Sequence, residues 1–250
     1  MKSIGIDSGS TMTKGVRMDG AVIEKKIMVP TGPNPRKTLE AVHAELYEEG
    51  AYTVTTGYGR NLLKASDKQV TEITCHGLGA GFIHEDIGAV IDIGGQDSKI
   101  ILLDQGGYVR DFLMNDKCAA GTGRFMEVIV RLLQMDMDDM DTMVVGASPA
   151  KISSMCTVFA ESEVVSLLAQ DVEPASIAKG VVESICRRTA NMAMRLPLQG
   201  KVFFSGGLSN VAAMQSSLST HLGMEVVTHE NGQYVGAIGA AMIGARQKKE

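Results

Sequence analysis

The chain has 250 residues, of which 44% are hydrophobic and 21% are charged, with 28 glycines and six prolines. This composition is typical of a folded globular protein and excludes disordered and collagen-like chains. The formal net charge of −5, from 29 acidic and 24 basic side chains, provides neither the basic surface that binds nucleic acid nor a polybasic segment for anionic lipid.

The first residues contain no apolar run long enough for a secretory signal, so we expect a cytoplasmic protein. The longest weakly polar stretch, residues 235–245, is about half of a bilayer span, so we expect no membrane segment. In a reducing compartment, the four cysteines at positions 75, 118, 156 and 186 are expected to be buried thiols, nucleophiles or metal ligands rather than disulfides.

Residues 4–16 predict a β-hairpin, because two short apolar runs flank a turn rich in Gly, Ser and Thr. Residues 89–101 repeat this pattern at a constant offset of 85, with seven positions in register. The matched pairs are Ile6/Ile91, Asp7/Asp92, Gly9/Gly94, Thr13/Ser98, Lys14/Lys99, Val16/Ile101 and Asp19/Asp104. A repeat of this kind predicts two related halves, which we place at residues 1–85 and 86–250.

The remaining elements follow from hydrophobic spacing and turn residues. We expect a helix over 36–49 and strands over 51–56 and 70–75 in the first half. In the second half we expect helices over 124–133, 159–169 and 174–194, a strand over 201–204, and a closing helix over 234–247 that could pack back on the first half. Strands that alternate with helices indicate an α/β fold.

The turn after Asp7 has the features of a phosphate-binding loop. Small residues let backbone N–H groups approach oxyanions, Ser10 and Thr11 can donate hydrogen bonds, and Lys14 is nearby. If the two halves face each other, Asp7 and Asp92 converge on one cleft, where paired carboxylates suit a Mg²⁺–polyphosphate. The alternative for each turn is an ordinary polar hairpin.

Glycines mark two further candidate positions. The pair Gly206-Gly207 follows the strand predicted over 201–204 and could lie against a base or ribose. Gly236, Gly239 and Ala240 in the closing helix permit close backbone packing, either against a neighbouring helix or at a hinge.

Two cysteines could carry chemistry. Cys118 and Cys156 each precede a predicted helix, whose N-terminus would stabilise a thiolate for metal ligation or nucleophilic attack. Cys186 lies on the apolar face of a predicted helix and is expected to be an inert core thiol, whereas the position of Cys75 leaves its role open. A [4Fe–4S] cluster needs four thiolates, so a chain that offers two could complete the set only across a two-fold axis.

Several of these segments resemble a known family. Residues 7–14 and 92–99 resemble the two phosphate motifs of the actin/Hsp70/sugar-kinase ATPase superfamily. Within it, residues 56–60, 115–125 and 156–163 are similar to motifs of the 2-hydroxyacyl-CoA dehydratase activators and the ATPase subunits of benzoyl-CoA reductase. The match spans nearly the whole chain and implies two actin-like (ribonuclease H-like) lobes around a nucleotide cleft.

The resemblance also implies a set of site residues. It implies a homodimer with one [4Fe–4S] cluster at its interface, held by Cys118 and Cys156 of each subunit, and one ATP or ADP in each subunit. From the repeated hairpins, we expect Asp7 and Asp92 to be the catalytic carboxylates and to bind the Mg²⁺ of the nucleotide. The resemblance assigns to the nucleotide Ser10, Thr11, Met12, Thr13, Lys14, Gln96, Gly206, Gly207 and Gln233. We expect further contacts from Gly9, Gly94, Gly95, Asp97, Gly121, Thr122 and Asn210.

The function that the resemblance implies is ATP-dependent electron transfer. Such proteins take an electron from ferredoxin or flavodoxin and deliver it at low potential to a partner enzyme, here one of 2-hydroxyacyl-CoA dehydratase type. One alternative is a small-molecule kinase of the same superfamily, with Glu161 or Glu163 as the base. Another is a nucleotide-dependent assembly protein that transfers no electron.

Overall fold

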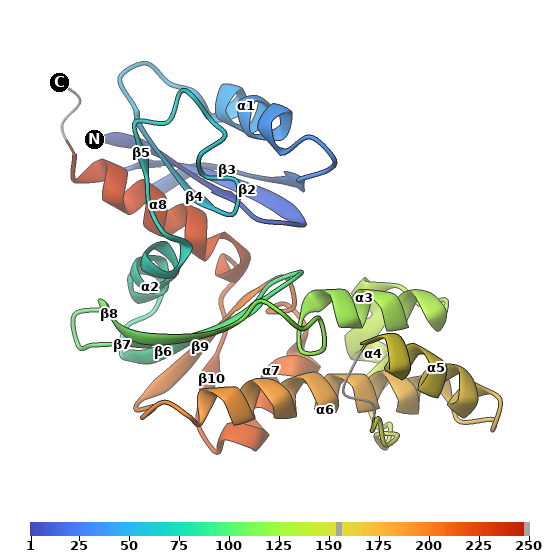
Figure 1. Cartoon of the computed structure of the whole chain (residues 1–250). Coiled ribbons are helices and arrows are strands. Elements are labelled where there is room, and N and C mark those ends of the chain that lie inside the picture. The colour runs from blue at the N-terminus through green and yellow to red at the C-terminus, as the bar shows by residue number, and fades with distance from the viewer. Residues whose placement is uncertain (154–156, 248–250) are drawn as a thin grey trace. The chain divides into compact units, whose positions relative to one another are not determined.

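The chain folds into two α/β units, and the computed structural model describes residues 1–153 and 157–247 (Figure 1). The first unit comprises Met1–Val90, Ile101–Phe112 and His229–Glu250, and the second comprises Ile91–Ile100 and Leu113–Thr228. Each unit therefore combines segments that are distant in the sequence.

The first sheet has five strands in the order β3-β2-β1-β4-β5. These strands are β1 (Lys2–Ser8), β2 (Met12–Asp19), β3 (Val22–Pro30), β4 (Tyr52–Gly57) and β5 (Lys68–Gln69). The pairs β1/β2 and β2/β3 are antiparallel, whereas β1/β4 and β4/β5 are parallel. The helices of this unit are α1 (Pro35–Leu46), α2 (Glu72–Ile83) and α8 (Val235–Ala245).

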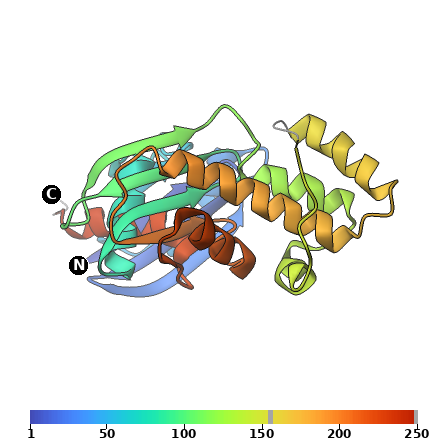
Figure 2. The same ribbon diagram turned by 90° about the horizontal axis from the view of Figure 1, so that it is seen from below.

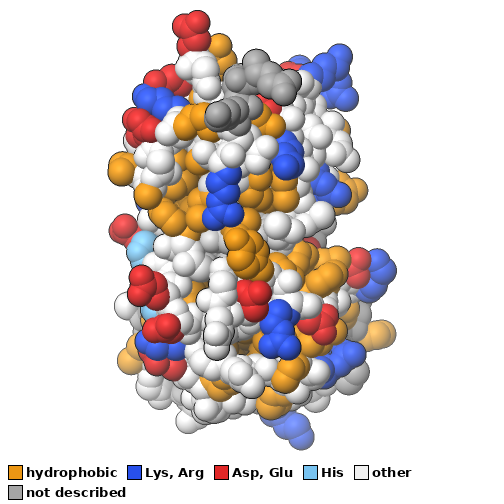
Figure 3. All heavy atoms as spheres, turned by 90° about the vertical axis from the view of Figure 1, so that its left-hand side faces the viewer, with side chains coloured by type: hydrophobic (Ala, Val, Ile, Leu, Met, Phe, Trp, Pro, Cys, Tyr) orange, Lys and Arg blue, Asp and Glu red, His pale blue; other side chains and the backbone are white. Residues whose placement is uncertain are grey.

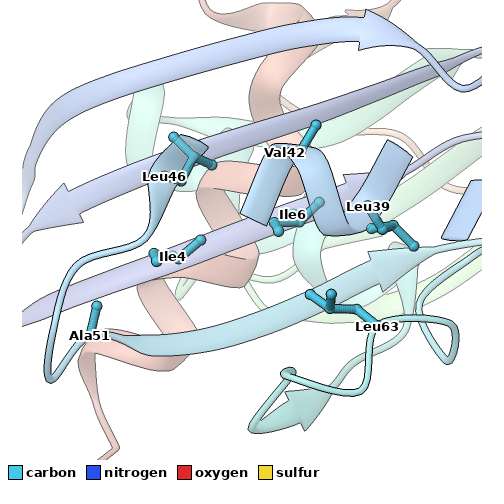
Figure 4. Close-up of a cluster of buried hydrophobic side chains, with 7 residues drawn as sticks. All are labelled: Ile4, Ile6, Leu39, Val42, Leu46, Ala51 and Leu63. Atoms are coloured by element: carbon cyan, nitrogen blue, oxygen red, sulfur yellow. The ribbon is translucent and has the colours of Figure 1, made fainter. Parts of the chain in front are cut away.

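The two faces of β1 bury different kinds of side chain. On one face a hydrophobic cluster joins the strand to α1, as Figure 4 shows; it contains Ile4, Ile6, Leu39, Val42, Leu46, Ala51 and Leu63. Burial of each large side chain in such a cluster contributes about 1.5–3 kcal/mol. On the other face, an added Cβ at Gly5 would overlap the backbone of α8 at Ala237. Because side chains alternate along a strand, Asp7 also points to the α8 face.

The strand predicted over residues 70–75 is wrong, because α2 begins at Glu72 and includes Cys75. The β-branched residues of this segment favour a strand only where they can pair with a sheet. Here the segment packs against α8 instead, through contacts that need glycine. A Cβ on Gly79 would overlap the Val235 carbonyl oxygen, and a Cβ on Gly239 would overlap the Cys75 carbonyl oxygen. Tertiary packing therefore overrides the local propensity.

The second sheet has the order β10-β9-β6-β7-β8. Its strands are β6 (Ile87–Ile93), β7 (Ser98–Leu103), β8 (Val109–Asn115), β9 (Lys201–Gly206) and β10 (Val226–Val227). Read from β8 to β10, this order repeats that of the first sheet from β3 to β5. The internal repeat predicted from the two hairpins is thus confirmed in the strand topology.

The helices of the second unit pack around the long helix α6, which Figure 2 shows in orange. They are α3 (Gly123–Leu132), α4 (Met140–Val144), α5 (Thr157–Leu168), α6 (Pro174–Ala193) and α7 (Ala212–Leu222). The Asp141 carboxylate on α4 accepts hydrogen bonds from the N–H groups of Ala212 and Ala213, at 3.0 and 2.9 Å, and so caps α7.

The other predicted helices and strands are confirmed within a few residues at their ends, whereas β3, β5, β8, β10, α4 and α7 were not predicted. Within the described ranges 1–153 and 157–247, no helix is long and apolar enough to cross a bilayer. On the described part of the face in Figure 3, Lys and Arg side chains are interspersed with Asp and Glu side chains. Charge of one sign is therefore not concentrated on this face.

We predict opposite effects for two alanine substitutions in α2. Gly79→Ala places a methyl group on the Val235 carbonyl oxygen and should lower the free energy of unfolding by about 1–3 kcal/mol or more. Gly81→Ala is the matched control, because the nearest heavy atom to its Cβ would be 3.6 Å away. That change should be neutral or stabilising by up to about 1 kcal/mol. Urea denaturation measures both, and equal effects would contradict the close contact between α2 and α8.

Candidate functional site

The two predicted hairpin turns are closed by the same hydrogen bond. In the first turn, the Gly9 N–H donates to the Met12 carbonyl oxygen at 3.1 Å. In the second, the Gly94 N–H donates to the Asp97 carbonyl oxygen at 2.9 Å. Both donors and both acceptors are related by the offset of 85 found in the sequence. The repeat therefore extends to the backbone of the candidate phosphate-binding turns, whose exposed tips carry Ser10, Thr11 and Gln96.

In each unit, a glycine in a left-handed conformation ends the strand that lies next to the hairpin. Gly57, with φ of 83°, ends β4, and its Cβ would be 2.6 Å from the Ser8 carbonyl oxygen. Gly206, with φ of 93°, ends β9, and its Cβ would be 2.7 Å from the Ile93 carbonyl carbon. Only glycine combines this φ with so close an approach. The Gly206 turn therefore lies directly against the end of β6, where the second hairpin turn begins.

Asp7 lies buried within a group of glycines. Its exposure is 3%, and its Oδ1 has no hydrogen-bond partner among the described residues. A Cβ on Gly57 would be 2.5 Å from Oδ1, and a Cβ on Gly236 would be 2.7 Å from Oδ2. A buried carboxylate oxygen without a donor is costly unless a cation or water engages it. The position therefore fits a divalent cation.

The first hairpin turn is anchored by Thr31, which follows β3. The Thr31 Oγ1 donates to the Gly9 carbonyl oxygen at 2.8 Å, and the Thr31 N–H donates to the Thr11 carbonyl oxygen at 2.9 Å. Lys14 lies opposite Asp7 in the β1/β2 register. Because residues directly opposite in an antiparallel pair share a face of the sheet, the Lys14 side chain lies on the same face as the Asp7 carboxylate.

Asp92 in the second hairpin is compensated by partners of its own. The Ser205 Oγ donates to its Oδ1 at 2.8 Å, and the Lys99 Nζ lies 3.3 Å from its Oδ2. The same ammonium lies 2.9 Å from the Asp97 Oδ2, and Lys99 is only 1% exposed. Such a buried pair is held together by mutual compensation of charge. The two hairpins therefore have the same backbone geometry but differ in the partners of their aspartate carboxylates.

The N-terminus of α3 lies on the second hairpin turn. The N–H groups of Gly123 and Arg124 donate to the carbonyl oxygens of Gly94 and Gly95 at 2.8 and 2.9 Å. A helix start has free N–H groups to offer, and here two of them fix the turn. Thr122 precedes these residues as the N-cap, so Thr122 and the adjacent glycine at 121 lie close to the turn.

Cys118 lies in the loop between β8 and α3, and it is partly exposed. The expectation that it occupies a helix N-terminus is wrong, because Thr122 takes that position. The loop is held by Asn115 instead: the Cys118 N–H donates to Oδ1 at 3.2 Å, and Nδ2 donates to the Cys118 carbonyl oxygen at 2.8 Å. Cys156 lies outside the described residues.

The other two cysteines are buried in helices. Burial raises the pKa of Cys75 in α2 to about 12, and burial raises the pKa of Cys186 in α6 to about 12. A thiol with such a pKa remains protonated at neutral pH and is a poor metal ligand or nucleophile. The expectation of an inert core thiol is confirmed for Cys186, and the same description applies to Cys75.

The remaining candidate residues lie in short turns. Asn210 is exposed in the loop after β9, where the Ser209 Oγ donates to the Gly206 carbonyl oxygen at 2.8 Å. Gln233 lies in the 3-10 turn Gly232–Tyr234 that leads into α8. The structure thus groups the candidates by unit. The first unit holds Asp7, Gly9, Ser10, Thr11, Met12, Thr13, Lys14 and Gln233; the second holds Asp92, Gly94, Gly95, Gln96, Asp97, Cys118, Gly121, Thr122, Gly206, Gly207 and Asn210.

The sequence reasoning missed Thr31, His76 and Ser205. Ser205 has a detectable signal, because Ser205-Gly206 at the end of β9 matches Thr56-Gly57 at the end of β4. Thr31 follows a strand that was not predicted. His76 lies in α2, just after the segment over 70–75 that was predicted as a strand, so no sequence signal placed it near Asp7.

Comparisons with known proteins agree with this architecture. A model of the BadF/BadG/BcrA/BcrD ATPase family matches residues 4–244. The uncharacterized protein YjiL of Escherichia coli K12 is 49% identical over 98% of this chain and 97% of its own length. The activator of lactoyl-CoA dehydratase from Anaerotignum propionicum is 42% identical over 100% of both chains.

A solved structure shows the same likeness. The activator of the 2-hydroxyisocaproyl-CoA dehydratase from Clostridium difficile, with bound ADPNP, has a TM-score of 0.91 and 35% identity, covering 98% of this chain and 94% of its own. The two repeated sheets therefore form an actin-like ATPase fold. From the matching family model and these relatives, the chain belongs to the BadF/BadG/BcrA/BcrD ATPase family.

Proposed function

We propose that this chain is an ATP-dependent electron-transfer activator of a partner enzyme of 2-hydroxyacyl-CoA dehydratase type. The observation that carries the proposal is the buried Asp7 carboxylate, which lies against Gly57 and Gly236 and whose Oδ1 has no hydrogen-bond partner among residues 1–153 and 157–247. A carboxylate oxygen of this kind is a suitable ligand for a nucleotide-bound Mg²⁺. The relatives named as dehydratase activators, one of them bound to ADPNP, supply the class of partner.

In this proposal both hairpin turns bind the phosphates of ATP. Ser10, Thr11 and Lys14 supply donors from the first turn, and backbone N–H groups of residues 94–97 supply donors from the second. Asp7 holds the cation, whereas Lys99 pairs with both Asp92 and Asp97 and so fixes the two carboxylates of the second turn. Gly206, Gly207, Asn210 and Gln233 are proposed to contact the nucleoside, with Gly207 leaving open space where a side chain would stand.

The cysteines fit a shared [4Fe–4S] cluster. Among the described cysteines, only Cys118 is accessible, because the thiols of Cys75 and Cys186 are buried and protonated. With Cys156 as the second ligand of each chain, four thiolates require a homodimer. When bound, the cluster would supply a one-electron carrier, and we propose ferredoxin or flavodoxin as the donor. Free thiolate ligands need reducing conditions, so we propose the cytoplasm as the location.

A continuous backbone path supports coupling between the nucleotide and Cys118. The second hairpin turn accepts hydrogen bonds from the first residues of α3, and the loop that holds Cys118 leads directly into that helix. The Thr122 Oγ1 also donates to the Ala119 carbonyl oxygen at 2.7 Å, which closes the end of this loop. A change at the phosphate-binding turn would therefore be transmitted to the backbone beside Cys118.

We predict that Asp7→Asn lowers Mg²⁺-dependent ATP hydrolysis roughly 100-fold, because the amide cannot replace the charge that holds the cation. Its folding stability should be unchanged or higher, since the buried Oδ1 has no hydrogen bond to lose among the described residues. Asp19→Asn, on the exposed end of β2, is the control and should keep activity. Steady-state ATPase assays and urea denaturation measure both properties.

Asp92→Asn should behave differently from Asp7→Asn. It removes one of the two carboxylates that pair with the buried Lys99, and it should lower both ATP hydrolysis and the free energy of unfolding. The loss of stability should be about 1–3 kcal/mol, because Asp97 still pairs with Lys99. If the two asparagine variants lose the same stability, the difference in charge compensation between the hairpins is refuted.

We predict that Cys118→Ala and Cys156→Ala each abolish iron binding, whereas Cys186→Ala leaves it intact, because only accessible thiolates can ligate iron. The measurement is iron and acid-labile sulfide in protein purified without oxygen, with four irons expected per dimer if one cluster is shared. Protein that hydrolyses ATP but contains no iron under these conditions would favour the kinase or assembly alternatives. Iron that depends on Cys186 would refute the ligand assignment.

A further inference from the structure

The Gly9 carbonyl oxygen in the first hairpin turn accepts a hydrogen bond from outside the hairpin, and so does its equivalent in the second turn. Gly94, which matches Gly9 at the offset of 85, receives the Gly123 N–H of α3 at 2.8 Å. Gly9 receives the Thr31 hydroxyl, also at 2.8 Å. The same atom of each turn is therefore fixed by a neighbouring element. In the second unit the donor is main chain, whereas in the first unit it is a single side chain.

The Thr31 hydroxyl belongs to a directed chain of hydrogen bonds. Its Oγ1 lies 2.9 Å from the Thr13 Oγ1 of β2, and the two residues are 3% and 0% exposed. A carbonyl oxygen can only accept a hydrogen bond, so the one hydroxyl proton of Thr31 is used toward Gly9. The Thr13 hydroxyl must then donate to Thr31, and the chain runs from Thr13 through Thr31 to Gly9. Hydrogen bonds that follow one another in this sense strengthen each other.

Two further hydrogen bonds hold the backbone of Thr31 in place. Its N–H donates to the Thr11 carbonyl oxygen at 2.9 Å, and its carbonyl oxygen accepts the Thr38 hydroxyl at 2.9 Å. Thr38 lies near the start of α1, which packs on the same sheet through the cluster in Figure 4. The Thr31 hydroxyl therefore reaches Gly9 from a backbone that is fixed by both the turn and a helix.

Both bonds from Thr31 to the turn orient peptide groups. In a planar trans peptide, the C=O and the following N–H point in opposite directions. The Gly9 carbonyl is bound to Thr31, so the Ser10 N–H points away from Thr31. The same holds for the Thr11 carbonyl and the Met12 N–H. Backbone N–H groups that face away from the anchoring residue are suited to bind the oxygens of a phosphate.

We propose that Thr31 is a positioning residue for phosphate binding: its hydroxyl holds the Gly9 peptide so that the Ser10 N–H faces the phosphates of the nucleotide. Thr13, expected from the sequence to contact the nucleotide, acts through Thr31, because its hydroxyl is buried and already donates a hydrogen bond. The inference rests on the proposed nucleotide binding, and it adds a residue that lies outside both phosphate motifs.

The test measures binding of ADPNP with Mg²⁺ by isothermal titration calorimetry, with the thermal midpoint of each variant in parallel. Thr31→Val keeps the shape and the backbone bonds of the residue but removes the hydroxyl, whereas Thr31→Ser keeps the hydroxyl. Thr53→Val is the matched control. Thr53 is also buried, at 2% exposure, its Oγ1 lies 3.3 Å from the His43 Nε2, and it pairs with Ile4, toward the start of β1 and away from the turn.

Thr31→Val should weaken ADPNP binding about 10-fold, which corresponds to the loss of roughly one hydrogen bond. Thr31→Ser should bind within about twofold of the wild type, because the hydroxyl is retained. Thr13→Val should weaken binding less, about 2–3-fold, because Thr31 can still donate to Gly9. Thr53→Val should lower only the thermal midpoint.

Unchanged ADPNP affinity in folded Thr31→Val, with or without a lower thermal midpoint, would show a purely structural role and overturn the inference. An equal loss in Thr31→Ser would also overturn it, since the hydroxyl would then not be the cause. A larger loss in Thr13→Val than in Thr31→Val would place Thr13 on the nucleotide and refute the chain. If the wild type itself binds no ADPNP, the proposed function fails instead.

Amide hydrogen exchange in the wild type covers the case in which Thr31→Val does not fold. The Thr31 N–H bonds Thr11 of the turn, whereas the Thr53 N–H bonds the Asp67 Oδ2 at 2.7 Å. Bound ADPNP should slow exchange at Thr31 at least about threefold more than at Thr53, because it suppresses local opening of the turn. Equal slowing at the two amides would overturn the inference.

Discussion

The first unit depends on direct contact between backbones at α8. At Gly5, Gly79 and Gly239, any side chain would overlap a neighbouring carbonyl oxygen or amide, so the helix lies as close to β1 and α2 as main chains can approach. Close packing between the backbones provides the dispersion contacts there, without large apolar side chains. The same closeness brings Gly236, in the first turn of α8, to the Asp7 carboxylate. The same backbone contacts therefore determine both the packing of α8 and the environment of the candidate catalytic carboxylate.

The two copies of the internal repeat have the same backbone geometry but differ in the charged groups around their aspartates. Equivalent hydrogen bonds close both hairpin turns, and a left-handed glycine follows the neighbouring strand in each unit. At the side-chain level the copies diverge, because Asp92 is engaged by Lys99 and Ser205 whereas the Oδ1 of Asp7 has no hydrogen-bond partner in the described part of the chain. In a buried setting, compensation of charge decides whether a carboxylate stabilises the fold or remains available for a ligand. One carboxylate is therefore satisfied within the protein, and the other remains available for a ligand.

The second unit joins its parts through helix ends. The first N–H groups of α3 are used by the hairpin turn at Gly94 and Gly95, and those of α7 are used by Asp141. Because these donors have no partner within their own helices, each bond ties a helix to another element. The loop that carries Cys118 is thereby connected to the candidate phosphate-binding turn by main chain alone.

By itself, the sequence determined the features that local patterns encode: both hairpins, the repeat at an offset of 85, the α/β class, and the buried character of Cys186. These depend on side-chain alternation, helical spacing and turn residues, which lie within one segment of chain. Tertiary structure alone decided that residues 72–83 form a helix, that Lys99 neutralises Asp92, and that His76 and Asp7 both lie against Gly236. The physical reason is that each of these outcomes depends on contacts between side chains or backbones from different elements, and a local propensity worth a fraction of a kcal/mol per residue yields to such packing.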